Sequence, residues 1–191
     1  MAGAPRATFA RMQDATVANY DIINAERDAF LLGYTDRVLD GLRLLESGTE
    51  GYAVSRLEHS RQSATRAYRD GRDTDYVVMC LLHDIGDTLA PRNHGELAAT
   101  ILRPYVEPRL TWIAKYHPIF QFHYYGIHVG ADPDMRDRYR DHEWYADTVE
   151  FCERYDENCF EVGYDSMSLE AFTPLLHDVL DRTPNWRHPD I

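Results

Sequence analysis

The chain has 191 residues, 44% of them hydrophobic, and a formal net charge of −12 at pH 7. This length is sufficient for one hydrophobic core, and the lack of any run of eighteen apolar residues argues against a membrane-spanning helix. The negative charge argues against nucleic acids and anionic lipids as partners, so we expect a small-molecule partner.

The N-terminal residues, up to about Asp21, lack the apolar run of a secretory signal, which predicts a cytoplasmic location. Cys80, Cys152 and Cys159 are odd in number and far apart, which favours reduced buried thiols over a disulfide framework. The basic residues are nineteen arginines and the single Lys115. Arginine suits bidentate pairing with carboxylates and, where it faces a pocket, with phosphate or phosphonate groups.

Apolar residues recur at helical spacing along most of the chain, and no Asn-Gly hairpin or sustained two-residue alternation appears. The sequence therefore predicts an all-α fold with few or no strands. Residues 1–50 are expected to form an N-terminal helical extension, residues 51–182 a single domain, and residues 183–191 a C-terminal tail. Thr74 or Asp75 is expected to cap the third helix. Helices are predicted over residues 36–46, 54–67, 74–83, 96–102, 110–116, 144–155 and 169–180.

Two polar residues, His83 and Asp84, follow the apolar segment 77–82, where burying them is costly unless a partner satisfies both. A metal ion is such a partner. Adjacent residues on a helix point about 100° apart, so a metal held by both, or two metals bridged by one carboxylate, needs ligands from other helices. A single histidine is more often an ordinary hydrogen-bonded residue, and only the ordered set favours a metal site. The further candidates are His59, His94, His117 and Asp156.

This ordered set, centred on the segment LLHDIGD at residues 81–87, resembles the HD-domain superfamily of helical metal-dependent phosphohydrolases and oxygenases. The resemblance covers about residues 57–156 and implies a single HD-domain helical bundle with a dinuclear metal site. Within the superfamily, the chain is most similar to the mixed-valent diiron oxygenases that cleave organophosphonates. Its size, the spacing from His94 to His117, and the segments 155–160 and 164–170 are similar to the type that acts on 1-hydroxy-2-(trimethylammonio)ethylphosphonate.

The resemblance implies a cofactor of two iron ions in the Fe(II)/Fe(III) state and O₂ as a co-substrate. It implies that one iron is held by His59, His83, Asp84 and Asp156, and the other by Asp84, His94 and His117. Asp84, His94 and His117 are then the catalytic residues, because they surround the iron that keeps open positions. The implied products are glycine betaine and phosphate.

The chain departs at four positions from the related enzymes that act on the primary-amine analogue. Those enzymes have a tyrosine and a glutamate before the first ligand, where this chain has Thr49 and Tyr52. Their lysine four residues after the fourth histidine is Gln121 here, and the histidine that follows their HD signature is Asp87. Recognition of a primary amine and of the phosphonate therefore cannot be carried over from them.

Aromatic residues are dense in the segment 120–125, just after His117. Aromatic faces attract quaternary ammonium groups, so we expect a cage for a trimethylammonium ion, although helix packing accounts for any one of these rings about equally well. The expected substrate contacts are Tyr52, Asp87, Gln121, Tyr124 and His128. The candidates for the anionic end of the substrate are His128, Gln121, Arg140 and Lys115.

Two other functions are compatible with the same residues. In a phosphohydrolase acting on a small phosphate ester or nucleotide, two metals would activate a bridging water. In a catalytically silent HD protein, the site would sense a ligand, although six intact candidate ligands argue against this function. Sites of histidine and carboxylate accept iron, manganese, nickel or zinc, so the sequence leaves the metal open, as it does the oligomeric state.

Overall fold

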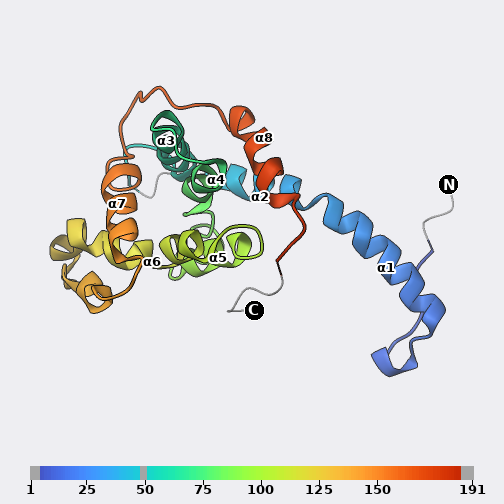
Figure 1. Cartoon of the computed structure of the whole chain (residues 1–191). Coiled ribbons are helices and arrows are strands. Elements are labelled where there is room, and N and C mark those ends of the chain that lie inside the picture. The colour runs from blue at the N-terminus through green and yellow to red at the C-terminus, as the bar shows by residue number, and fades with distance from the viewer. Residues whose placement is uncertain (1–4, 48–50, 186–191) are drawn as a thin grey trace.

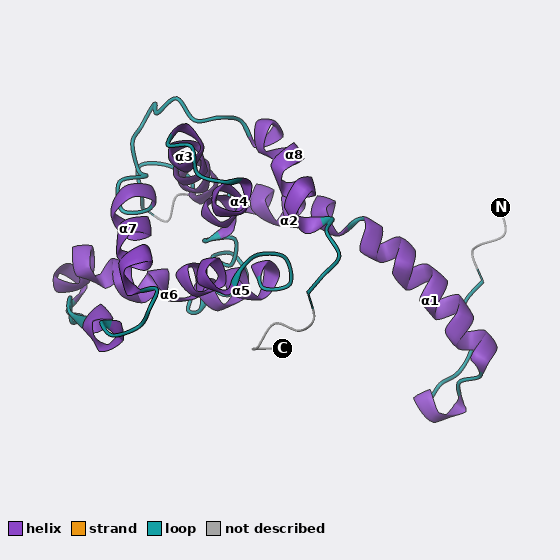
Figure 2. Ribbon diagram, in the orientation of Figure 1, coloured by secondary structure: helices purple, strands orange, loops and turns teal. Residues whose placement is uncertain are grey.

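The computed structural model describes residues 5–47 and 51–185, and these residues form helices and no strands (Figure 2). The all-α fold expected from the sequence is therefore confirmed. The α-helices are α1 (Val17–Leu32), α2 (Tyr34–Leu44), α3 (Arg56–Arg69), α4 (Thr74–Leu82), α5 (His94–Leu102), α6 (Pro108–Tyr125), α7 (Tyr145–Tyr155) and α8 (Leu169–Leu180). Three short 3-10 helices are η1 (Met12–Asp14), η2 (Gly126–Val129) and η3 (Met135–Tyr139).

Helix α4 lies at the centre of the core, and every side chain from Tyr76 to Leu82 is buried. Helices α3, α6 and α8 pack against it. Helix α2 adds Val38, Leu39 and Leu42 to the same core, whereas α1 projects from the body and has no buried residue (Figure 1). Burial of one such aliphatic side chain stabilises the fold by about 1.5–3 kcal/mol. The buried α4 therefore holds its C-terminal end, where His83 and Asp84 follow, in a fixed position.

The N-terminal cap of α4 differs from the prediction. Asp73 has extended backbone angles, and its carboxylate accepts a hydrogen bond from the backbone N–H of Tyr76 (2.8 Å). Thr74 and Asp75, the predicted caps, are instead the first two helical residues. The capping residue is the last one with extended backbone angles before the helix, and its side chain accepts from an N–H of the first turn. Asp73 meets both conditions, so the cap lies one residue before Thr74.

Helix α6 is longer than predicted, because it continues through Pro118 to Tyr125. A proline inside a helix lacks the N–H that would bond to the carbonyl four residues earlier, and it was therefore interpreted as a stop. Here that carbonyl, of Ala114, accepts a hydrogen bond from His117 Nδ1 (2.7 Å). The side chain takes the place of the missing backbone donor, and the helix goes on.

The three cysteines are free and buried, as predicted. Burial raises the pKa of the Cys80 and Cys152 thiols, which keeps both protonated near neutral pH. Among residues 5–47 and 51–185, no helix is both long and apolar enough to cross a membrane.

Candidate metal centre

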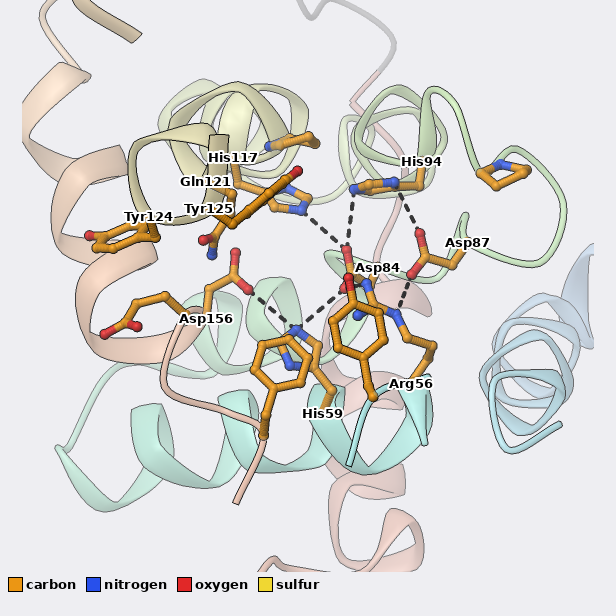
Figure 3. Close-up of a pocket in the computed structure, with 15 residues that line it drawn as sticks. Arg56, His59, Asp84, Asp87, His94, His117, Gln121, Tyr124, Tyr125 and Asp156 are labelled. Carbon is orange, nitrogen blue, oxygen red and sulfur yellow. Dashed lines mark hydrogen bonds and ion pairs between the residues drawn. The ribbon is translucent and has the colours of Figure 1, made fainter. Parts of the chain in front are cut away.

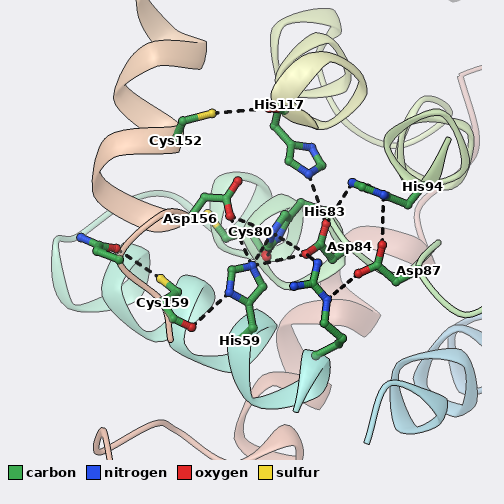
Figure 4. Close-up of polar contacts among 12 residues, drawn as sticks. His59, Cys80, His83, Asp84, Asp87, His94, His117, Cys152, Asp156 and Cys159 are labelled. Atoms are coloured by element: carbon green, nitrogen blue, oxygen red, sulfur yellow. Dashed lines mark hydrogen bonds and ion pairs between the residues drawn. The ribbon is translucent and has the colours of Figure 1, made fainter. Parts of the chain in front are cut away.

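The structure brings all six predicted ligands together, from five places in the chain (Figures 3 and 4). Five of the side chains are buried, and that of His94 is partly exposed. His59 comes from α3, His83 and Asp84 directly follow α4, His94 begins α5, His117 lies in α6, and Asp156 directly follows α7.

Asp84 lies between the histidines, and its two carboxylate oxygens face different ones. Its Oδ2 lies 3.3 Å from His59 Nε2 and 3.4 Å from His83 Nε2. Its Oδ1 lies 3.2 Å from His117 Nε2 and 3.4 Å from His94 Nε2. One carboxylate thus joins two groups of imidazoles, the arrangement that a bridging ligand needs.

The histidines all present the same nitrogen to Asp84. A backbone carbonyl can only accept a hydrogen bond, so an Nδ1 beside one carries the proton and leaves Nε2 with its lone pair. Three histidines are fixed in this way: His59 by the carbonyl of Cys159 (3.1 Å), His83 by that of Cys80 (2.7 Å) and His117 by that of Ala114 (2.7 Å). This is the tautomer that binds a metal through Nε2.

The spacing of these lone pairs fits a cation. His59 Nε2 and His83 Nε2 lie 3.1 Å apart, and Asp156 Oδ1 lies 3.3 Å from the first and 3.7 Å from the second. Two facing lone pairs at this distance repel each other unless a cation lies between them. Ligands bound to one metal at about 2.0–2.2 Å are separated by about 3.0–3.5 Å, close to the distances seen here. Asp156 Oδ2 is also buried and without a hydrogen-bond partner.

The electrostatics of the group also favour a bound cation. Burial lowers the pKa of His83, but the carboxylates of Asp84 and Asp156 raise it more, so the net direction is well upward. Burial raises the pKa of Asp156, but the imidazoles of His59 and His83 beside it lower the pKa by more, so this carboxyl stays ionised. The carboxylates of the cluster therefore stabilise a positive charge beside them, either a proton on His83 or a metal ion in its place.

Close packing of α5 on α6 places the second pair of histidines. A Cβ on Gly95 would lie 2.7 Å from the carbonyl oxygen of Lys115 and 2.8 Å from that of Ala114, distances that no side chain permits. Because Gly95 has no side chain, the two helices approach closely. The rings of His94 and His117 consequently lie 5.2 Å apart, centroid to centroid.

Asp87 supports the site. Its Oδ1 lies 3.0 Å from His94 Nδ1, and its Oδ2 accepts from Nε of Arg56 (2.5 Å). Nη2 of the same guanidinium donates to Asp84 Oδ2 (2.5 Å). Sequence reasoning missed Arg56, although a residue three positions before His59 shares its helix face and could have been found on that ground.

A cavity of about 440 Å³ lies beside the six residues, and it contains most of the predicted substrate contacts (Figure 3). Tyr52, Asp87, Gln121 and Tyr124 line it. His128 does not, because it lies exposed in η2. Of the two other candidates for the anionic end, Lys115 pairs with Glu96 and Arg140 with Asp137, both away from this cavity. Thr49 lies outside the described residues.

The cavity has an aromatic wall that the sequence only partly indicated. Phe160 stacks on Tyr52 (ring centroids 5.0 Å apart) and on His59 (4.4 Å), and Tyr125 also lines the cavity. Arg56 is the only arginine or lysine among the lining residues of the described chain. Gln121 Nε2 is buried without a hydrogen-bond partner. The cavity thus offers aromatic faces, a fixed positive charge and an amide donor beside the candidate metal ligands.

Comparison with known families finds a match in the central part of the chain. Residues 56–147 match the HD domain family. The match covers five of the six candidate ligands, and Asp156 lies beyond its end. HD domains are typical of metal-dependent hydrolases and related enzymes, as expected from a buried cluster of histidine and aspartate. No curated protein matches the chain.

The geometry predicts which histidines matter for metal content. For a cluster that binds two ions, we expect His94→Ala and His117→Ala each to lower the metal content to one ion per chain, because each removes a ligand from the same side of Asp84. His123→Ala and His142→Ala are the matched controls, since His123 is exposed and His142 stacks on Trp112 away from the cluster. Elemental analysis after reconstitution measures this, and a lost ion in His123→Ala would contradict the ligand set.

Proposed function

We propose that this HD-domain chain holds two metal ions, natively iron, and uses O₂ to cleave the C–P bond of (1-hydroxy-2-(trimethylammonio)ethyl)phosphonate. The products are glycine betaine and phosphate. The observation that carries the proposal is Asp84, whose two oxygens face two separate pairs of histidines. A bound iron pair would supply the activation of O₂, which side chains alone do not provide.

The chain's residues would divide between the two ions. His59, His83 and Asp156 lie on the Oδ2 side of Asp84, and His94 and His117 lie on its Oδ1 side. The Oδ1 side has fewer protein ligands. We therefore expect the substrate's hydroxyl and phosphonate oxygens to bind on that side, beside Gln121, which lies one helical turn after His117.

The aromatic wall suits the cationic end of the substrate. A trimethylammonium group has no N–H to donate, and aromatic faces stabilise it by about 0.5–2 kcal/mol for each good contact. Tyr52, Tyr125, Phe160 and the Glu157 carboxylate line this part of the cavity. Phe160 also stacks on Tyr52 and His59, and the Arg56 guanidinium lies 5.1 Å from the centroid of the Tyr52 ring, so the substrate would share these faces with groups already present. A primary ammonium in this place would leave its donors partly unpaired, which is unfavourable.

Arg56 and Gln121 suit the anionic end. The Arg56 guanidinium is held by Asp87 through Nε, and its Nη2 reaches Asp84 at the inner end of the cavity. A phosphonate oxygen there would receive charge-assisted hydrogen bonds. Binding of both the cationic and the anionic end of the substrate would fix its C1–H bond relative to the candidate metal ligands. This restriction of the substrate's position would be the chain's main contribution to the rate.

The test is a coupled measurement on protein loaded anaerobically with Fe(II). We expect O₂ uptake at an oxygen electrode and release of one phosphate per O₂ from the trimethylammonium substrate, with neither in His117→Ala. Phosphate released from a simple phosphate ester without O₂ uptake would instead establish the alternative, a metal-dependent HD phosphohydrolase. Two observations support this second candidate: the HD family match and the cationic Arg56 beside the candidate metal ligands.

Substrate preference gives a second prediction, centred on Tyr52. The native chain should turn over the trimethylammonium substrate several-fold to about thirtyfold faster than the primary amine, the factor that one or two aromatic contacts provide. Tyr52→Glu should narrow or reverse this preference, because it exchanges a π face for a carboxylate that pairs with N–H donors. Tyr52→Phe is the matched control and should keep the preference. Initial rates of O₂ uptake with both substrates decide the matter, and an unchanged ratio in Tyr52→Glu would argue against the cage.

A further inference from the structure

A second cavity, of about 460 Å³, lies between the C-terminal end of α5, the first half of α6 and the loop before α7. It shares no lining residue with the cavity at the metal cluster. Its volume is in the range of small-molecule sites. The lining residues are Arg103, Pro108, Thr111, Trp112, Lys115, Tyr116, His142 and Trp144.

The charge of this cavity is opposite to that of the chain. Among the described residues, the lining contains two cations, Arg103 and Lys115, and no acidic side chain, although the chain as a whole carries a net charge of −12. Lys115 also pairs with Glu96, a half-exposed residue outside the lining, at 3.2 Å, and Arg103 has an interaction of its own as well, so a ligand would share both cations. A positive hollow in an acidic protein selects anions from solution.

Two uncharged polar groups of the lining residues are buried without a hydrogen-bond partner. The Thr111 hydroxyl is buried without a partner, in a residue only 3% exposed, and the Trp112 indole N–H is buried without a partner as well. His142 Nδ1 accepts from the backbone N–H of Trp144 (3.2 Å), so the proton of its neutral ring is on Nε2. Buried donors without partners are unfavourable, and a ligand rich in acceptors would satisfy them.

Aromatic rings make up the rest of the wall. Trp112 lies between His142, stacked on it with centroids 3.4 Å apart, and Tyr116 at 4.0 Å. Trp144 meets Trp112 edge to face at 6.0 Å. Such a wall favours a ligand whose apolar part is flat, because flat rings pack on aromatic side chains with little loss of contact.

We propose that this cavity is a second ligand site, which binds a small organic anion with a flat apolar ring. Arg103 and Lys115 bind the anionic group of the ligand. The Thr111 hydroxyl and the Trp112 N–H donate to its acceptor atoms, and its ring packs against the aromatic side chains of this second cavity. The site is independent of the metal cluster and of the reaction proposed there. The cavity shares helix α6 with His117.

Two dyes of similar shape test the proposal. 8-Anilinonaphthalene-1-sulfonate is a flat ring system with an anionic group, and N-phenyl-1-naphthylamine is its uncharged analogue. Fluorescence titration should show one saturable site per chain for the sulfonate, with an affinity at least about tenfold higher than for the neutral dye. Lys115→Gln should weaken binding of the sulfonate at least about fivefold and leave the neutral dye unchanged, and Trp112→Phe, which removes the N–H, should weaken the sulfonate as well.

The control is Arg56→Gln, which removes a positive charge from the other cavity. It should leave the affinity for the sulfonate unchanged. Equal affinities for the two dyes, or weaker sulfonate binding in Arg56→Gln but not in Lys115→Gln, would overturn the proposal. Thermal melts by circular dichroism establish that each variant is folded, and Lys115→Gln changes a side chain that is only partly buried and lies outside the hydrophobic core.

Discussion

Asp84→Asn is expected to remove both ions of the proposed two-metal site. The two oxygens of this buried carboxylate face different pairs of histidines, so one substitution alters both groups at once. An amide is neutral and offers only one acceptor oxygen, and it binds hard cations far less well than a carboxylate does. Elemental analysis after reconstitution should show a fall from two ions per chain to near zero, together with loss of turnover.

Asp87→Asn is the matched control, because this carboxylate contacts His94 and Arg56 but belongs to the surroundings of the cluster. Loss of such a supporting group typically weakens metal affinity by about 10–100-fold without removing a ligand. The variant should therefore still bind two ions when the metal concentration is raised. If Asp84→Asn kept two ions under the same conditions, the bridging role would be wrong.

Gly95→Ala is expected to disturb the Oδ1 side of the cluster through the backbone. The added Cβ would meet the carbonyls of Lys115 and Ala114 below 3 Å, so α5 must move away from α6. The Ala114 carbonyl also orients His117, and the displaced helix begins with His94. Overpacking of this kind costs about 1–3 kcal/mol, or about 2–4 °C in melting temperature for each kcal/mol. We expect one ion per chain to be lost or bound much more weakly.

Gly41→Ala is the control for that experiment. A Cβ at Gly41, in α2, would lie 3.5 Å from the Ile85 side chain, an ordinary contact. An alanine there favours the helix by up to about 1 kcal/mol and should leave the metal content at two. A thermal melt and elemental analysis of both variants separate a local effect at the metal cluster from general destabilisation. Two firmly bound ions in Gly95→Ala would contradict the role given to helix contact.

The helices and the cluster could be predicted because their signals are local. Hydrophobic spacing defines a helix within a dozen residues, and the pair of His83 and Asp84 at the end of an apolar helix already needs a partner. Helix α8 has the bounds that its apolar pattern predicts. The extension of α6 was missed since Pro118 was interpreted alone, without the histidine before it, whose side chain replaces the lost donor.

Other parts of the site depend on which surfaces meet. Phe160 lies in the loop after α7, about a hundred residues along the chain from Tyr52 and His59, and no residue near it in sequence indicates that it stacks on them. Asp87 was expected to contact substrate, and only the packing of α3 beside it shows that both its oxygens already have partners, Arg56 and His94. His128 belongs to an aromatic run in sequence, but a turn into η2 carries it to the surface.

Pro118 separates two parts of α6 that have different roles, one beside the candidate metal ligands and one lining the cavity. The stretch before Pro118 carries His117, whose orientation depends on the Ala114 carbonyl that the proline leaves free. The stretch after it carries Gln121, Tyr124 and Tyr125, which line the cavity. Changes in the second stretch need not disturb the ligand in the first. A lineage could therefore exchange one substrate for another by altering the cavity wall while the metal-binding half of the helix stays as it is.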